Sequence, residues 1–233
     1  MSAAFDPPPD VPPTLSVVVP AGPGERAWTA LFDDLPERDD VERVLVLAEG
    51  DALPSAPHGT RVLTAPAGRA TQINAGLRAA RASTVWVLHA DSRIDAETLA
   101  SARRAATNWT NGGPLALCWF DLGFHDGPAA MAINAFGANL RSRWFGLPFG
   151  DQGLLAARTL FASLGGFDEG GGSGEDNAFV RAAHRAGVPL QRLPGRVQTS
   201  ARRYVERGWW RTTCEHLALT WSQRREFERW GSR

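Results

Sequence analysis

One aspartate stands directly after a run of residues that predicts a buried strand. Thr84-Val85-Trp86-Val87-Leu88 is mostly apolar, and His89-Ala90-Asp91-Ser92 follows it. In open α/β sheets, ligands bind outside the carboxyl ends of the strands. Asp91 is therefore a candidate ligand of a divalent metal, which could in turn hold a diphosphate. The alternative is that Asp91 caps the next helix, which would begin near Asp95-Ala96-Glu97.

A second polar group stands between two glycines, in Phe149-Gly150-Asp151-Gln152-Gly153. The glycines let the backbone approach a ligand, while Asp151 and Gln152 supply a carboxylate and an amide. A tight turn without a ligand explains the same residues.

A third polar group follows a glycine-rich loop at residues 165–174. The loop ends at Glu175-Asp176, where a helix begins. Carboxylates at a helix N-terminus are stabilised by the macrodipole by about 0.3–1 kcal/mol, which is one explanation for them. The functional alternative is a general base that a mobile loop delivers to a substrate.

Two adjacent arginines, Arg202 and Arg203, lie in the basic last part of the chain. Guanidinium groups match phosphate oxygens bidentately, so the pair could grip a diphosphate, although a solvated surface is the alternative. The candidate histidine ligands of a metal are His89, His184 and His216. Of these, His216 is preferred because it follows the arginine pair.

The elements that must position these residues alternate between strand and helix. In the first half, strands are predicted at 15–20, 41–48, 61–65 and 84–88, and helices at 27–32, 69–82 and 96–108. This alternation predicts a mostly parallel, doubly wound α/β sheet, whose polar loops gather at one edge. In the second half, strands are predicted at 115–122 and 153–158, and helices at 131–144, 177–186 and 209–230.

The chain length predicts one large domain after a disordered, proline-rich segment at residues 1–13. This domain, residues 14–233, divides into a nucleotide-binding half at 14–113, an acceptor half at 114–200 and a basic aromatic C-terminal helix at 201–233.

Charge is zero overall but unevenly distributed. Residues 1–60 hold 11 acidic and 3 basic side chains, whereas residues 181–233 hold 12 arginines and 4 acidic side chains. A basic C-terminal part suits phosphate groups or an anionic membrane surface. No nucleic-acid recognition motif is evident, so we expect no nucleic-acid partner. The tryptophans and arginines after residue 206 leave a weak peripheral membrane contact open, beside packing on the domain or a homodimer interface.

All 25 basic residues are arginine, which excludes a Schiff-base lysine and a P-loop lysine. Cys118 and Cys214 are isolated, which argues against a structural zinc site or a disulfide framework. We see neither a signal peptide nor an apolar stretch of the roughly 20 residues that span a bilayer. These features favour a cytoplasmic location, with the inner face of the membrane as an alternative.

Taken in order, the motifs resemble those of the family-2 glycosyltransferases of the GT-A fold. They are similar in particular to the subgroup called radical-SAM/selenodomain-associated transferases, type 2. The matching segments are SVVVP, GRATQINAGLRAARASTVWVLHADS, GDQGLLAARTLFASLGGFDE and GED at a helix start, within about residues 14–215. The resemblance implies a GT-A nucleotide-diphospho-sugar transferase with a UDP- or GDP-linked donor, Mn²⁺ or Mg²⁺, and inverting transfer to an unidentified hydroxyl acceptor.

The resemblance also implies roles for the matched residues. Asp91 matches the aspartate at the end of the DxD motif, which binds the metal and the diphosphate, and His89 stands where many relatives have the first aspartate. Asp176, beside Glu175, matches the usual catalytic base. The other implied contacts are with the base or ribose (Glu49 or Asp51), the donor site (Gly68, Arg69 and Asn74), the acceptor and sugar region (Asp151 and Gln152) and the donor phosphates or leaving group (Arg202 and Arg203).

The sequence departs from the family at two places. The loop Ala21-Gly22-Pro23-Gly24-Glu25 replaces a Pro-x-Asn-Glu-like segment, and the loop before Glu175 is glycine-rich where relatives have apolar residues. Two other functions stay open. One is a nucleotidyltransferase, although the lysine expected after its glycine-rich loop is missing. The other is a non-catalytic nucleotide-binding protein on a degenerate transferase fold.

Overall fold

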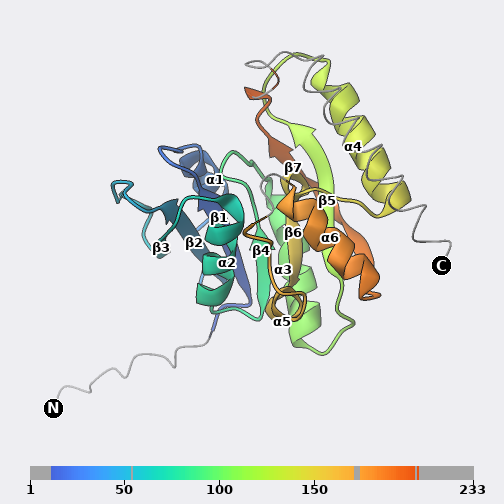
Figure 1. Cartoon of the computed structure of the whole chain (residues 1–233), viewed down its shortest axis with the longest axis horizontal. Helices are drawn as coiled ribbons and strands as arrows, with labels where there is room; N and C mark the ends of the chain where they lie inside the picture. The colour runs from blue at the N-terminus through green and yellow to red at the C-terminus, as the bar shows by residue number, and fades with distance from the viewer. Residues whose placement is uncertain (1–11, 54, 171–173, 203, 205–233) are drawn as a thin grey trace.

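The chain folds around one mixed sheet. The structure is a computed structural model that describes residues 12–53, 55–170, 174–202 and 204. Within these residues, seven strands run in the order β3-β2-β1-β4-β6-β5-β7 (Figure 1). β6 is antiparallel to both β4 and β5, and the other pairings are parallel. The predicted mostly parallel α/β sheet is confirmed.

The first half of the chain matches its predicted elements to within three residues at each end. Its strands are β1 (Leu15–Ala21), β2 (Val41–Ala48), β3 (Thr60–Ala65) and β4 (Thr84–Val87), and its helices are α1 (Trp28–Asp34), α2 (Arg69–Ala79) and α3 (Ala96–Thr110). Every residue of β1 and of β4 is buried. Such continuous apolar runs are typical of parallel strands covered on both faces.

The second half contains elements that the sequence pattern did not reveal. It comprises β5 (Leu117–Phe124), α4 (Met131–Phe145), the 3₁₀ turn η1 (Gly150–Gln152), β6 (Leu154–Ala157), α5 (Arg158–Ser163), α6 (Glu175–Arg185) and β7 (Leu190–Thr199). α5 and β7 were not predicted, whereas α6 begins at Glu175-Asp176 as expected, two residues before the range 177–186 given for that helix. β7 is an edge strand containing Pro194-Gly195, which is where proline is tolerated in a sheet but which hides the strand's periodicity.

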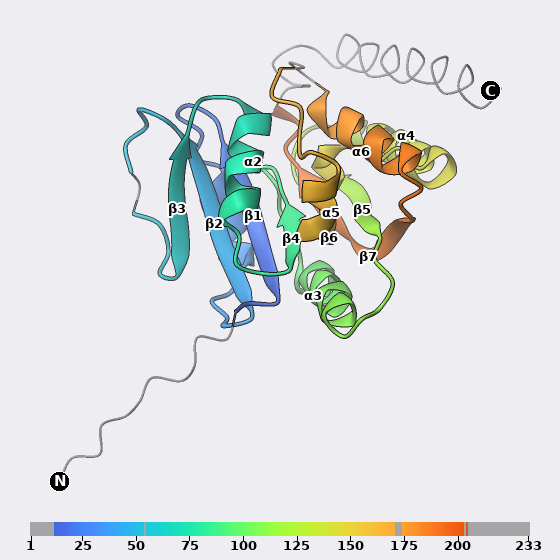
Figure 2. The same ribbon diagram turned by 60° about the horizontal axis from the view of Figure 1, so that its bottom comes forward.

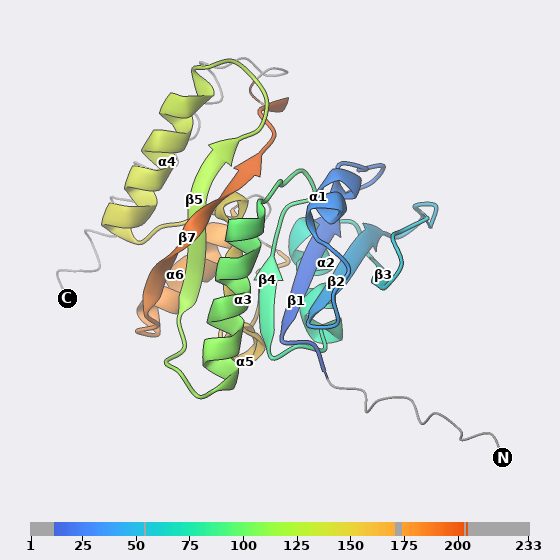
Figure 3. The same cartoon turned by 180° about the vertical axis from the view of Figure 1, so that it is seen from behind.

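Helices cover both faces of the sheet. α1 and α3 pack on one face, where Trp86 and Phe120 lie with ring centroids 5.0 Å apart (Figure 3). α2, α5 and α6 cover the other face (Figure 2). There Phe167 and Phe179 stack at 4.8 Å, and Phe161 lies 5.0 Å from Phe179. This aromatic stack fixes the start of the glycine-rich loop against α6.

α2 lies unusually close to the sheet because of Gly76. A Cβ added there would overlap Val18 Cγ1 and lie 3.2 Å from Val46 Cγ2. The absence of a side chain at Gly76 therefore allows this close packing.

Among the described helices, none combines the length and apolar character that crossing a membrane requires. The disorder predicted for residues 1–13 and the helix predicted for 209–230 fall mostly or wholly outside the described residues.

Candidate functional site

A buried glutamine fixes the first turn of α2 at the carboxyl ends of β1 and β2. Gln72 Nε2 donates to the carbonyl oxygens of Ala21 at 2.6 Å and Val46 at 3.0 Å. Arg69, the first residue of α2, is thereby held at the edge of the sheet where ligands of such folds bind. Gln72 was not among the predicted site residues, since its sequence context does not distinguish a buried anchor from a surface amide.

Arg69 lies at the centre of a cluster of ionisable side chains that come from three segments of the chain. Its Nε donates to Glu175 Oε1, and its Nη2 lies 3.7 Å from Asp176 Oδ2. Its Nη1 lies 3.5 Å from His89 Nε2, which is itself 3.8 Å from Asp176 Oδ2. Residues that begin α2, follow β4 and begin α6 therefore meet at one place, whereas the motifs predicted them only one at a time.

Asp176 is buried and yet held in its charged form. Burial raises the pKa of a carboxyl, but the neighbouring His89 and Arg69 side chains and the Gly150 backbone together lower the pKa of Asp176 below its usual value. Its Oδ1 is buried and accepts no hydrogen bond from the described residues. The site thus presents an ionised carboxylate with one oxygen uncommitted.

Gly150 allows η1 to press against this carboxylate. A Cβ added to Gly150 would lie only 2.5 Å from Asp176 Cγ. The glycine was predicted to admit a ligand, and in the structure it admits the Asp176 side chain.

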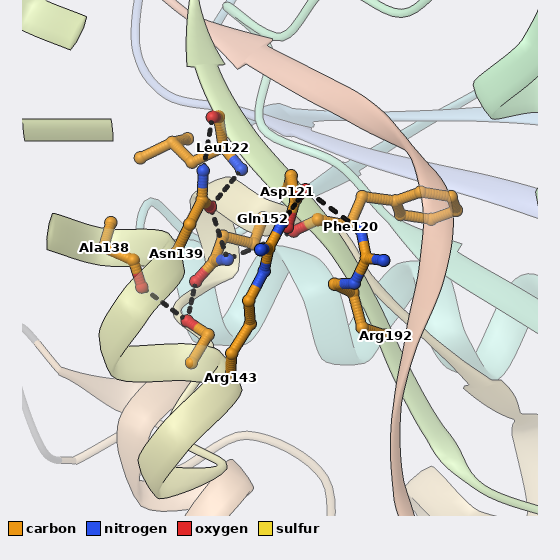
Figure 4. A network of polar contacts seen from close by, with 9 residues as sticks. Phe120, Asp121, Leu122, Ala138, Asn139, Arg143, Gln152 and Arg192 are labelled. Atoms are coloured by element: carbon orange, nitrogen blue, oxygen red, sulfur yellow. Dashed lines mark hydrogen bonds and ion pairs between the residues drawn. The ribbon is translucent and has the colours of Figure 1, made fainter. Parts of the chain in front are cut away.

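The side-chain amide of Gln152 forms hydrogen bonds with other groups of the protein. Its Oε1 accepts from Ser142 Oγ at 2.5 Å and from Phe149 N at 3.2 Å, and its Nε2 donates to Phe120 O at 3.1 Å (Figure 4). Gln152 is fully buried. The structure therefore places it as an anchor of η1 between α4 and β5, rather than facing an acceptor.

Asp151 differs from Gln152 in its hydrogen bonding. Its Oδ1 is buried without a hydrogen-bond partner in the described part of the chain. Desolvation lowers the pKa of Arg69, but the charges of Asp176, Glu175 and Asp151 outweigh it and raise that pKa. Asp151 thus adds negative charge beside the cluster and has one side-chain oxygen that no described residue engages.

Asn74 holds the glycine-rich loop. Its Nδ2 donates to Phe167 O and to Glu169 Oε1, both at 2.8 Å, and its Oδ1 accepts from Phe167 N at 2.9 Å. The side chain is saturated by these bonds and buried. The structure places Asn74 as a tie between α2 and the loop before α6, not among groups open to a donor.

Asp91 lies beyond the end of β4, near the ends of β5 and β7. Thr199 Oγ1 donates to its Oδ1 at 3.5 Å, and His125 Nε2 lies 3.2 Å from its backbone oxygen. The N-cap of α3 is Asp95, whose side chain accepts from Thr98 N at 2.8 Å. The alternative that Asp91 serves as a helix cap is therefore wrong.

Asp91 fits a metal that is shared with a diphosphate. Within the described residues, no three His, Cys, Asp or Glu side chains gather as a protein-only metal site. Mg²⁺ commonly takes one or two carboxylates and completes its shell with phosphate oxygens and water, which a single aspartate satisfies. His125, which the sequence analysis missed, is an imidazole beside Asp91. His184 lies in the last turn of α6, and His216 lies outside the described residues.

The candidate base or ribose contacts lie after β2. Asp51 Oδ1 and Oδ2 accept from Gly24 N at 3.3 and 3.2 Å, which ties the loop after β2 to the loop after β1. Glu49 is exposed at the same edge.

Arg202 reaches across to the loop after β1. Its Nη2 donates to Glu25 Oε2 at 2.8 Å, while Glu25 Oε1 accepts from Arg26 N and Ala27 N. Burial raises the pKa of Glu25, but these bonds and the Arg202 charge lower it overall. A guanidinium is thus placed near the carboxyl ends of the strands, whereas Arg203 lies outside the described residues. Glu25, in the loop noted as a departure from the family, is a site residue that the sequence analysis missed.

Comparison with known proteins yields structural neighbours alone. No family model and no curated protein sequence matches the chain. S. aureus TarS residues 1–349 matches with a TM-score of 0.54 and 18% identity over 80% of this chain and 58% of that one. A structure of the same TarS fragment in complex with UDP-GlcNAc matches with a TM-score of 0.55 and 17% identity, over 80% of this chain and 56% of that chain.

A third neighbour is the mannosyltransferase PcManGT from Pyrobaculum calidifontis, in complex with GDP-Man and Mn²⁺. It matches with a TM-score of 0.55 and 21% identity, over 82% of this chain and 58% of that one. The chain thus spans less than two thirds of these neighbours. At such identities the likeness establishes the fold, which is the GT-A fold of glycosyltransferases that the motifs predicted.

Proposed function

We propose that the chain is a metal-dependent, inverting glycosyltransferase. It would move a sugar from a UDP- or GDP-linked donor to a hydroxyl acceptor, as a member of family 2. The observation that carries the proposal is the cluster of Arg69, His89, Glu175 and Asp176 at the ligand-binding edge of a GT-A sheet. The complexes of its structural neighbours with UDP-GlcNAc and with GDP-Man and Mn²⁺ support this donor class.

The donor would lie at the carboxyl ends of β1, β2 and β4. Asp51 and Glu49 would contact its base or ribose, and Arg202 its phosphates, since a guanidinium matches phosphate oxygens. Asp91 would hold Mn²⁺ or Mg²⁺, and the bound ion would neutralise charge on the departing diphosphate.

Asp176 would act as the general base. As the acceptor oxygen attacks the anomeric carbon, the bond from that carbon to the diphosphate oxygen breaks, and the hydroxyl proton passes to Asp176. The carboxylate is already ionised, and its uncommitted Oδ1 has the lone pair to receive the proton. Arg69 and His89 would hold the other oxygen in place. Such a base contributes about 10²–10⁴-fold to the rate.

Donor hydrolysis tests this function without knowledge of the acceptor, because water can replace a hydroxyl substrate. Proton NMR of UDP- and GDP-sugars with Mg²⁺, which unlike Mn²⁺ does not broaden the signals, should show release of the nucleotide and a sugar whose anomeric configuration is initially inverted. Retention of configuration would contradict the inverting mechanism. No turnover of any donor would favour a non-catalytic nucleotide-binding protein instead.

A further inference from the structure

α4 carries an apolar stripe on its outer surface. Ile133, Phe136 and Trp144 are 66%, 67% and 73% exposed, and with Gly137 and half-exposed Leu140 they line one side of the helix. In Figures 1 and 3, α4 lies at the periphery, outside β5 and β7. Exposed apolar patches of this kind mark interaction sites.

The opposite side of α4 is fixed by polar contacts, so the helix cannot roll to bury the stripe. Asn139 Oδ1 accepts from Leu122 N at 2.7 Å, and its Nδ2 donates to Leu122 O at 3.1 Å. Arg143 Nη2 donates to Asp121 at 2.5 Å, and Ser142 donates to Gln152 (Figure 4). The stripe therefore faces outward, where another segment or molecule can reach it.

The described chain ends beside the first turn of α4. Ala201 lies against Gly127, where an added Cβ would come within 2.5 Å of the Ala201 Cβ. The Tyr204 ring meets Phe124 edge-on at 5.7 Å, and its hydroxyl bonds to the side chain of Asn134. Tyr204, the last described residue, therefore lies beside the N-terminal end of α4.

The sequence of residues 205–233 repeats the spacing of the stripe. Ile133, Gly137, Leu140 and Trp144 are separated by steps of four, three and four residues, and so are Trp210, Cys214, Leu217 and Trp221. Steps of three and four place side chains on one face of a helix. The six residues from Tyr204 to Trp210 can span roughly 20 Å, so the tether allows a parallel alignment in this register.

We infer that residues 209–221 dock as a helix along the apolar stripe of α4, parallel to it, with Cys214 opposite Gly137. The tether gives this segment an effective concentration in the millimolar range or above, which a second copy lacks. An anionic membrane is disfavoured as the occupant because, of the arginines on α4, Arg141 is buried and Arg143 is paired with Asp121.

Disulfide trapping in the full-length chain tests the contact. Gly137→Cys places a thiol in the stripe, where an added Cβ meets nothing within 4 Å. The native Cys214 is its intended partner, and Cys118 stays inert because burial raises its pKa to about 12. Thr107→Cys, at an exposed position of α3, is the matched control.

Under mild oxidation, Gly137→Cys should form an intrachain disulfide at least about ten times faster than the control, because docked thiols are held together. Peptide mass spectrometry should identify a link between the thiol that Gly137→Cys introduces and Cys214, and adding Cys214→Ser should abolish it. A rate equal to that of the control would overturn the inference. A covalent dimer would assign the stripe to a second copy, and protection of the introduced thiol only by anionic vesicles would assign it to a membrane.

Discussion

At the scale of single residues, the site depends on how one carboxylate is kept charged although it is buried. Asp176 would be neutral in an apolar interior, but His89 and Arg69 lower its pKa. A carboxylate whose pKa is lowered by folding stabilises the fold above its unfolded pKa of about 3.9, and loses that contribution as the pH falls through the folded pKa. Asp176 therefore stays ionised throughout the neutral and mildly acidic range.

The pH dependence of stability tests this charge. We expect wild type to lose unfolding free energy relative to Asp176→Asn as the pH falls from about 5 to about 3. Chemical denaturation of both proteins between neutral pH and about pH 3 measures it. A difference that does not change between about pH 5 and pH 3 would mean that folding does not lower the pKa of Asp176.

Substitution of the same residue also tests its chemistry. Asp176→Asn keeps the shape of the side chain but removes the proton acceptor, so donor turnover should fall by about 10²–10⁴-fold while donor affinity stays unchanged. Steady-state kinetics with nucleotide-sugar binding in parallel separates the two effects. Turnover equal to that of the wild type would refute the role of Asp176 as the base.

At the scale of elements, two glycines set how closely segments approach, and each predicts a different outcome. Gly150 faces the Asp176 carboxylate, which is the movable end of a side chain, whereas Gly76 faces Val18 and Val46 in the buried sheet. Substitution of Gly150 should lower turnover, whereas substitution of Gly76 should lower the free energy of unfolding.

Gly150→Ala should push the Asp176 carboxylate from its place. Misplacing a reacting group by about 1 Å can cost on the order of 10²-fold in rate, so we expect a loss of turnover with a small loss of stability. Turnover and thermal unfolding of the purified variant measure both. A loss of stability without any loss of turnover would show that η1 does not position the base.

Gly76→Ala provides the converse case. The added methyl overlaps Val18 in a closely packed core, and overpacking of this kind typically costs about 1–3 kcal/mol. Urea denaturation should report that loss, with the residual folded enzyme keeping its turnover per molecule. An unchanged or higher unfolding free energy would mean that α2 can shift away from the sheet without cost.

The elements also show why sequence reasoning succeeded in one half of the chain and fell short in the other. The mostly apolar segments Leu15–Ala21 and Val41–Ala48 predicted parallel strands, because burial on both faces of the sheet selects apolar residues with few interruptions. β7 is an edge strand in which exposed and buried residues mix around Pro194-Gly195, so no periodicity revealed it.

At the scale of the whole molecule, the fold brings together site residues that lie far apart in the sequence. Arg69 and Glu175 are separated by 106 positions, yet the sheet order brings α2 and α6 together at one edge. The sequence motifs predicted that Asn74 and Gln152 contact the donor and the acceptor. They could not tell an amide that binds a ligand from one that binds backbone, since that depends on the partners that folding supplies.

Calorimetric nucleotide binding can test whether a metal-dependent donor site lies at this edge of the sheet. UDP, GDP and their sugars would be titrated with Mn²⁺ and with EDTA into wild type, Asp91→Ala and the exposed control Asp33→Ala. We expect that one nucleotide class binds only with metal, that Asp91→Ala loses this binding and that the control keeps it. Binding that depends neither on metal nor on Asp91 would refute a metal-dependent donor site at Asp91.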